Sequence, residues 1–274
     1  MRRSINAVFL TVLLARLFLP QAGWGAWASG GAQCNTSEEV SDTTLVCTLA
    51  VENAEVGNVM LCVFGIDNTG TADGTSSEIA SVTDSSSNTY NFLAAFRNGQ
   101  GAAAAGAQVE AWYSILGTLL SSGSSTITLT TANTITDKVM QCIEFTIGAG
   151  NIITIEGAIQ TGASDNADAG SLTISGIVSL EYLFLRGIAP ESNAATSMTA
   201  TASYTLYPGA GCLNTLTGGE ASDMGSCGEW RILTATGDTS DPTLVGTTND
   251  NASIYMALKE AAPPATAPQV IVID

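Results

Sequence analysis

The chain contains no histidine. Histidine is the usual general base of Ser/His/Asp and Cys/His catalytic sites and a very common nitrogen ligand for metals. Its absence excludes those nucleophilic enzymes and every imidazole metal site. Any chemistry that the protein performs would have to depend on carboxylates.

Basic residues are also scarce, with Lys+Arg at 8 against Asp+Glu at 25, which gives a formal net charge of -17. A negative surface repels phosphates, so we expect neither a nucleic-acid partner nor an anionic lipid surface. Charged residues make up only 12% of the chain and hydrophobic residues 45%, whereas charged residues usually make up roughly a quarter. The chain can therefore form a sizeable core, and its polar surface must consist mostly of Ser, Thr, Asn and Gly.

Residues 1–28 have the pattern of a secretory signal peptide. Met1–Arg3 is basic, Ala7–Leu19 is mostly apolar, and Ala26–Ala28 supplies a small-x-small cleavage site. The apolar stretch is shorter than the roughly 20 residues that span a bilayer, and no later segment is long and apolar enough to do so. We expect a secreted protein, extracellular or at the cell surface, with no membrane span after signal cleavage. Cleavage removes three arginines and no acid, so the mature charge is 5 minus 25, or -20.

Six cysteines follow the expected cleavage site, and an even number in an exported chain predicts disulfides. Their spacing favours a Cys34–Cys47 bridge and a Cys212–Cys227 bridge. Cys62 and Cys142 lie in apolar, strand-like runs, where a bridge and two buried free thiols are both open alternatives. The lack of a C-x-x-C pair and of histidine argues against zinc.

The apolar residues repeat with a period of two, which is typical of β-strands. Alternating segments predict half-exposed strands, dense apolar runs predict central strands, and Asx/Gly-rich turns separate them. No amphipathic helix is evident. The sequence predicts an all-β fold over residues 29–260, a two-sheet antiparallel sandwich of jelly-roll-like type with about a dozen strands. The alternating segments are Thr126–Thr130 and Ser197–Leu206, and the dense runs are Val59–Phe64, Leu183–Leu185 and Ile254–Leu258.

The two parts of this region resemble each other. A buried strand, a segment with Glu next to or near Trp, and a closing apolar strand occur in the same order around residues 43–147 and again around 170–260. This suggests an internal duplication, either as two tandem sandwiches or as one sandwich to which both halves contribute. No linker separates the halves, which favours one domain.

The hairpin Val82–Tyr90, the segment Val109–Tyr113, a Thr-rich strand and the closing strand Ile254–Lys259 together resemble a loosely defined group of exported bacterial β-sandwich surface proteins. The resemblance covers most of the mature chain. It implies the fold and export, and no activity. The chain departs from the pattern at Ser87, where glycine is commoner in such a turn.

Two glutamates beside aromatic residues are candidates for carboxylate catalysis. Glu110 is near Trp112, and Glu229 precedes Trp230. Glycoside hydrolysis needs one acid as proton donor and a second as base or nucleophile. The tryptophans would then be glycan platforms, although packing in the core or between the sheets is the more common role of such residues.

Clusters of oxygen ligands in the turns are candidate calcium sites. None has EF-hand spacing, and Asx residues are also ordinary turn formers. The expected cofactor is therefore none or calcium. The clusters comprise Asp67, Asn68, Asp73 and Glu78, then Asp165, Asn166 and Asp168, and then Asp238, Asp241, Asn249 and Asp250.

The C-terminal segment 261–274 combines an Ala/Pro-rich linker with a strand-forming apolar tail, Val270, Ile271, Val272 and Ile273. Such a tail can add to a sheet edge of a neighbouring subunit, or it can fold back onto its own sandwich. The leading expectation is an exported, non-enzymatic structural protein that self-assembles into an appendage, filament, surface layer or adhesive matrix. A lectin-like, calcium-dependent glycan-binding module is the alternative, and a carboxylate glycosidase is the third.

Overall fold

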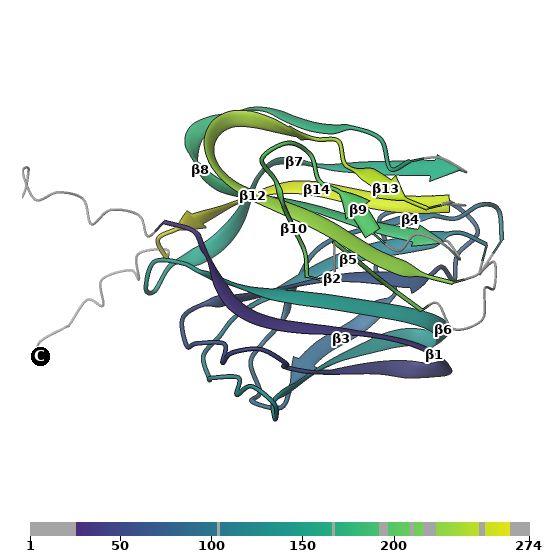
Figure 1. Cartoon of the computed structure of the whole chain (residues 1–274), viewed down its shortest axis with the longest axis horizontal. Coiled ribbons are helices and arrows are strands. Elements are labelled where there is room, and N and C mark those ends of the chain that lie inside the picture. Colours follow the sequence, from purple (N-terminus) through teal and green to yellow (C-terminus); the bar gives the residue numbers. More distant parts are fainter. Residues whose placement is uncertain are drawn as a thin grey trace, which may run out of the picture.

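The computed structural model describes residues 26–102, 105–165, 168–191, 197–208, 211–215, 223–246 and 250–263. All of the regular structure in these residues is β-strand, and every strand pairing is antiparallel. Two six-stranded sheets lie face to face (Figure 1). The predicted all-β, two-sheet antiparallel sandwich is confirmed. No helix in the described part of the chain has the length and apolarity to cross a membrane.

The first sheet is formed by the first half of the chain. Its order is β1-β6-β2-β5-β4, with β3 paired to β6. The strands are β1 (Ala28–Thr48), β2 (Val59–Asp67), β3 (Ile79–Asp84), β4 (Asn91–Asn98), β5 (Ala107–Ile115) and β6 (Thr126–Thr146).

The second sheet is formed by the second half. Its order is β10-β12-β8-β14-β7, with β11 paired to β12, and a separate two-stranded ribbon pairs β13 with β9. The strands are β7 (Ile152–Asp165), β8 (Leu172–Glu191), β9 (Ser197–Thr199), β10 (Thr205–Leu206), β11 (Cys212–Asn214), β12 (Gly225–Ser240), β13 (Thr243–Val245) and β14 (Asp250–Ala261).

The main core lies between the two sheets. Alternate side chains of β2, such as Leu61 and Val63, pack there with Leu185 of β8 and Met256 of β14. The sheets approach so closely that a Cβ on Gly65 would lie 1.8 Å from the carbonyl oxygen of Gly225. Only glycine fits at that crossing.

The outer face of the central strands β2 and β8 is also buried, because the long strands of each sheet extend over it. Met60 and Phe64 of β2 are covered by Leu45 of β1 and Leu129 of β6. In the second sheet, Tyr182, Phe184 and Tyr255 pack with Ile174 and Ile177 of the first part of β8. This double burial explains why β2 and the second part of β8 read as continuous apolar runs.

The repeated landmarks of the two halves occupy corresponding places. Glu110 on β5 is opposite Phe64 of β2, and Glu229 on β12 is opposite Arg186 of β8. The closing strands β6 and β14 lie on the other side of β2 and β8. The triplets β5-β2-β6 and β12-β8-β14 therefore carry the landmarks in the same order, while the duplication itself stays a prediction.

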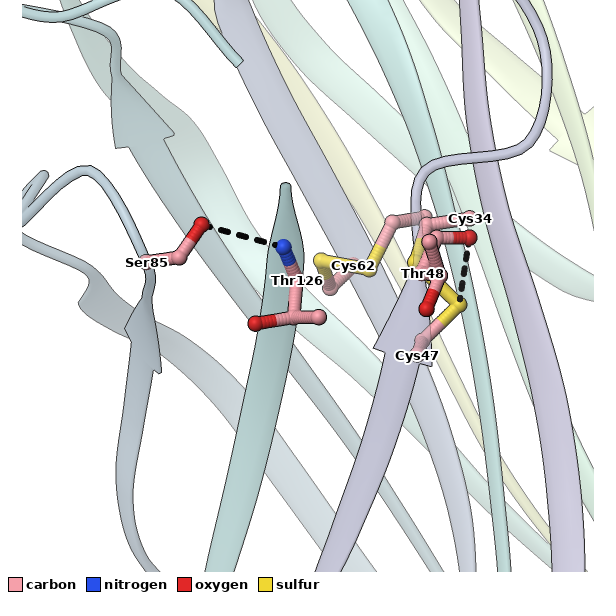
Figure 2. The surroundings of a disulfide bond; sticks show 7 residues. Cys34, Cys47, Thr48, Cys62, Ser85 and Thr126 are labelled. Carbon is pink, nitrogen blue, oxygen red and sulfur yellow. Dashed lines mark hydrogen bonds between the residues drawn. A yellow bond between two sulfur atoms is a disulfide. The ribbon is translucent and has the colours of Figure 1, made fainter. Parts of the chain in front are cut away.

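Three disulfides are present: Cys34–Cys47, Cys62–Cys142 and Cys212–Cys227. The two pairings expected from spacing, Cys34–Cys47 and Cys212–Cys227, are confirmed. Cys62 and Cys142, for which a bridge and free thiols were both open, form a bridge. Cys62 and Cys142 are opposite each other on β2 and β6. Figure 2 shows Cys62 near the Cys34–Cys47 bond, and all four cysteines belong to the core on the outer face of the first sheet.

The turn at Ser87 has the geometry that favours glycine. Ser87 has a positive φ of 62°, in the left-handed region. Asp84 holds this turn, because its carboxylate accepts hydrogen bonds from the backbone N–H groups of Ser86 and Asn88. The side chain of Asn88 in turn fixes the chain at Gly117 and Thr118.

Candidate functional site

Glu110, one of the two candidate catalytic acids, is fully buried in a hydrogen-bond network. Its carboxylate accepts from the Ser77 hydroxyl at 2.6 Å and the Glu78 N–H at 2.6 Å. It also accepts from Gln108 and from the indole N–H of Trp112 at 3.3 Å. Burial raises the pKa of Glu110, and these hydrogen bonds oppose the rise. The carboxylate holds the segment before β3 against β5.

Glu229, the second candidate acid, has an equivalent role in the other sheet. It is fully buried and accepts from the N–H and hydroxyl of Thr201 and from the hydroxyl of Ser240 at 2.7 to 2.8 Å. Glu110 shares the outer face of the first sheet with Phe64, and Glu229 shares the outer face of the second with Arg186. Both sheets therefore separate the two carboxylates, which do not form the close pair that glycoside hydrolysis needs.

The two candidate glycan platforms are half-buried packing residues. Trp112 lies edge-on to Phe92 with 5.6 Å between ring centroids, and Trp230 lies edge-on to Phe145 at 5.1 Å. Trp230 packs on the core between the sheets, and Trp112 packs on the core outside the first sheet. Both rings therefore contribute to packing.

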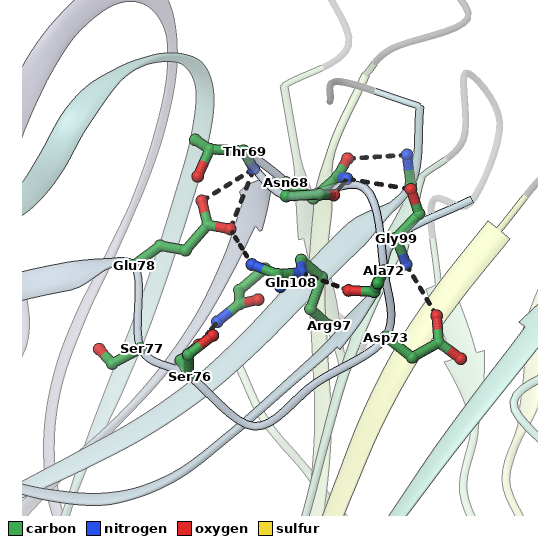
Figure 3. A network of polar contacts seen from close by, with 12 residues as sticks. Asn68, Thr69, Ala72, Asp73, Ser76, Ser77, Glu78, Arg97, Gly99 and Gln108 are labelled. Carbon is green, nitrogen blue, oxygen red and sulfur yellow. Dashed lines mark hydrogen bonds and ion pairs between the residues drawn. The ribbon is translucent and has the colours of Figure 1, made fainter. Parts of the chain in front are cut away.

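The first calcium group predicted from sequence is divided in two. Figure 3 shows Glu78 and Asp73 in a network that fixes the loop after β2. Glu78 pairs with Arg97 at 3.0 Å and accepts from the N–H of Thr69. Asp73 accepts from the N–H of Gly99 at 3.0 Å. Asp67 is not part of this network and faces the space between the sheets.

The other two predicted groups are also dispersed. Asp238 pairs with Arg231 and accepts from the Tyr204 hydroxyl at 2.8 Å. Asp241 is exposed, and Asp168 accepts from the N–H of Leu244 at 2.9 Å. Asp165 accepts from Asn98 and Gln100. Asn166 and Asn249 lie outside the described residues, as does the tail Val270–Ile273.

The structure instead brings six acids to one end of the sandwich. Glu39 and Asp137 are directly opposite on β1 and β6, and Asp67 ends β2 one residue beyond the last β2–β6 pair. On the second sheet, Asp250 and Glu191 are directly opposite on β14 and β8. We call the set the acidic end; it consists of Glu39, Asp67, Asp137, Glu191, Asp223 and Asp250.

These acids point into the space between the sheets. Side chains two residues apart on a strand share a face, so Asp67 and Asp137 share the face of the core residues Val63 and Val139. Glu191 and Asp250 likewise share the face of Ala189 and Ala252. The acids of the first sheet therefore face those of the second sheet at the end of the core between the sheets. An isolated bridge between Glu191 and Met224 brings Asp223 to the same place.

Mutual repulsion and burial disfavour ionisation at this end. Burial, and then the charge of Asp137, raise the pKa of Asp67 to about 7. Burial raises the pKa of Asp137 to about 6, with Glu39 and Asp223 contributing and a hydrogen bond from Thr215 opposing. Burial and Asp250 raise the pKa of Glu191 to about 8.

Four of the six acids were not selected from the sequence: Glu39, Asp137, Glu191 and Asp223. A signal for two of them is present. Asp67 and Glu191 come shortly after the dense runs Val59–Phe64 and Leu183–Leu185. Asp137 comes shortly before the apolar segment Val139–Ile143, and Asp250 shortly before the run Ile254–Leu258. Because neighbouring antiparallel strands run in opposite directions, the end of one strand meets the start of the next. Acids at those positions meet when the strands that carry them are neighbours in the sheet.

No known protein-family model matches this chain, and no curated protein is similar to it.

Proposed function

We propose that the protein is an exported, non-enzymatic structural subunit that self-associates by β-strand addition. The three disulfides support an oxidising compartment, since such bonds persist outside the cytosol. Both candidate catalytic glutamates have structural hydrogen-bonding roles. The observation that carries the proposal is the edge of the second sheet.

That edge is β7, which ends the strand order and pairs only with β14 among the described strands. It runs for 14 residues and has no Lys, Arg or Pro. Natural proteins usually protect edge strands with such residues, above all lysine. Its charged residues are Glu156, which pairs with Lys259 of its own sheet, and Asp165 at its end. β7 carries one bulge, because Gln160 pairs with Tyr255 and Glu156 with Ala257. The segments on either side of this bulge are templates for another strand.

The chain supplies a strand-forming segment of its own, Val270–Ile273. The last residue of β14, Ala261, pairs with Ile152, the first residue of β7. The chain thus leaves the sandwich beside the start of the unprotected edge. Addition of this segment to β7 of a second copy would provide main-chain hydrogen bonds and bury alternate apolar side chains.

Deletion of residues 270–274 tests the donor segment. The signal-cleaved protein is expected to form ordered multimers by electron microscopy and light scattering, and the deleted protein is expected to remain monomeric. If the truncated protein assembles as well as the full chain, the donor is not the tail.

Lysine substitution tests the acceptor edge. Thr161 is exposed on β7, and Thr161→Lys is expected to prevent assembly, because a charge on an edge opposes pairing. Thr128→Lys is the matched control, since Thr128 lies on β6 with strand neighbours on both sides. Equal assembly of both variants would place the contact away from β7.

A further inference from the structure

We propose that the acidic end binds a divalent cation of the calcium type through Glu39, Asp67, Asp137 and Asp223, and that this ion joins the two sheets. Of these four acids, only Asp67 belongs to a turn cluster that the sequence suggested. It is independent of the proposed self-association.

The spacing of three carboxylates fits one ion. Ligand oxygens of Glu39, Asp137 and Asp223 all lie within 4.8 Å of one another. Calcium–oxygen distances are about 2.3 to 2.6 Å, so oxygens on opposite sides of one calcium ion are about 4.6 to 5.2 Å apart. All three carboxylates can therefore bind a single ion without a large rearrangement.

Asp67 provides an independent observation that points to a cation at this end. Its side chain is only 7% exposed, and its Oδ1 is buried with no hydrogen-bond partner. A buried carboxylate oxygen without a partner is costly. It shares the inward face with Asp137 on the neighbouring strand. A cation between these strands would supply the partner that this oxygen lacks.

The donor set selects a hard cation. The chain has no histidine, and all six cysteines are in disulfides, so only oxygen ligands are available. Carboxylate oxygens suit calcium, which takes six to eight oxygen ligands in a flexible geometry. The Thr215 hydroxyl donates to Asp137 Oδ1 at 3.0 Å. A hydrogen bond to a ligating carboxylate orients it toward the metal.

The nearest lysine in sequence forms its ion pairs with acids outside the proposed site. Lys138 is next to Asp137, but its side chain is on the other face of β6. Its ammonium pairs there with Glu38 at 3.3 Å and Asp42 at 3.1 Å. It also donates to the backbone carbonyl of Val40 at 2.7 Å. A bound ion would add positive charge on the inward face, where Lys138 forms no ion pair.

The ion would connect strands that are distant in sequence. Glu39, Asp67 and Asp137 belong to the first sheet, and Asp223 leads into β12 of the second. A ligand that binds only the folded protein stabilises it by mass action. Calcium is therefore expected to hold the two sheets together at this end.

Calorimetric titration of CaCl₂ into the signal-cleaved, EDTA-stripped protein tests the site. We expect one bound ion per chain and a rise in Tm with calcium. Asp137→Asn is expected to weaken calcium binding by about tenfold or more. Asp241→Asn, which removes one charge from an exposed acid suggested by the sequence, is expected to bind as the wild type does.

The Tm in EDTA distinguishes the loss of a calcium ligand from the loss of a residue that only stabilises the fold. Removal of one of several repelling carboxylates should not lower the Tm in EDTA, so Asp137→Asn should fold and lose only the calcium-dependent increase. A wild-type protein that shows no heat of binding and no Tm shift at millimolar calcium would overturn the proposal. Equal calcium affinity of the wild type and Asp137→Asn would also overturn it.

Discussion

At the scale of single residues, the most informative side chains are buried acids with specific hydrogen-bond partners. Glu110 and Glu229 each connect a sheet to a segment that crosses its outer face. From the sequence they could be selected as unusual residues, because each lies beside an aromatic residue in an apolar strand. Their role could not be predicted, because their partners, such as Ser77 and Thr201, come from other parts of the chain.

Substitution of Glu110 by alanine should destabilise the protein markedly. The change leaves the Glu78 N–H, the Gln108 amide and the Trp112 indole without their acceptor in a buried site. One buried donor left unsatisfied costs about 1 to 3 kcal/mol, so we expect a loss of at least about 2 kcal/mol in the free energy of unfolding. Urea unfolding followed by tryptophan fluorescence measures it.

Two further variants make this result specific. Glu110→Gln keeps an acceptor oxygen and should lose less than Glu110→Ala. Glu55→Ala removes an exposed carboxylate and should change the free energy of unfolding little. If Glu110→Ala were as stable as Glu55→Ala, the network around Glu110 would not contribute to the fold.

At the scale of strands, the double burial of β2 and β8 is the feature that organises the fold. The dense apolar runs predicted these central strands, and the alternating Thr-rich run predicted the half-exposed first part of β6. Local patterns could not predict that β1 and β6 extend for 21 residues each and cover the outer face of their own sheet. That arrangement depends on register shifts around Asp42, where the pairing of β1 with β6 continues in a new register.

The disulfides should contribute unequally to stability. A crosslink restricts the unfolded chain more when it closes a longer loop. The Cys62–Cys142 bridge spans 80 residues, and the Cys212–Cys227 bridge spans 15. On loop entropy, removal of the first pair by alanine substitution should cost about 4 to 5 kcal/mol, and removal of the second about 3 kcal/mol.

Chemical unfolding of the two double-alanine proteins, under the same buffer and temperature, measures the difference. The Cys34–Cys47 pair, with a span of 13 residues, serves as a second short-loop control. The two short-loop variants should be close to each other in stability. A long-loop variant more stable than both would show that loop entropy does not rank these bonds.

At the scale of the whole molecule, the two ends of the sandwich differ. One end carries the six facing acids, and the other carries the last residue of β14 beside the first residue of the β7 edge. The sequence predicted a strongly acidic protein. It could not show that acids separated by most of the chain meet at one end, because this needs the strand order of both sheets. The acidic end is therefore where the ionic environment should act on the fold.

The stability of the calcium-free protein should depend on pH in a direction set by this end. The relevant carboxyls have raised pKa values, about 8 for Glu191, about 7 for Asp67 and about 6 for Asp137. The groups that face them are acids from every strand that reaches this end, and Lys138 is the cation that acts on Asp137. These acids are Glu39 from β1, Asp223 before β12, Asp250 from β14 and Glu78 from the loop after β2.

In the unfolded chain the same carboxyls release their protons near pH 4. Between about pH 4.5 and pH 8 the folded protein thus binds more protons than the unfolded chain, so its free energy of unfolding falls as the pH rises. Urea unfolding in EDTA should show lower stability at pH 8 than at pH 5.5, at constant ionic strength. Glu191→Gln has no carboxyl to titrate at that position, and its stability should fall less over the same interval. If the wild-type protein in EDTA were as stable at pH 8 as at pH 5.5, or more stable, the carboxyls of the acidic end would not lie close together in the folded protein.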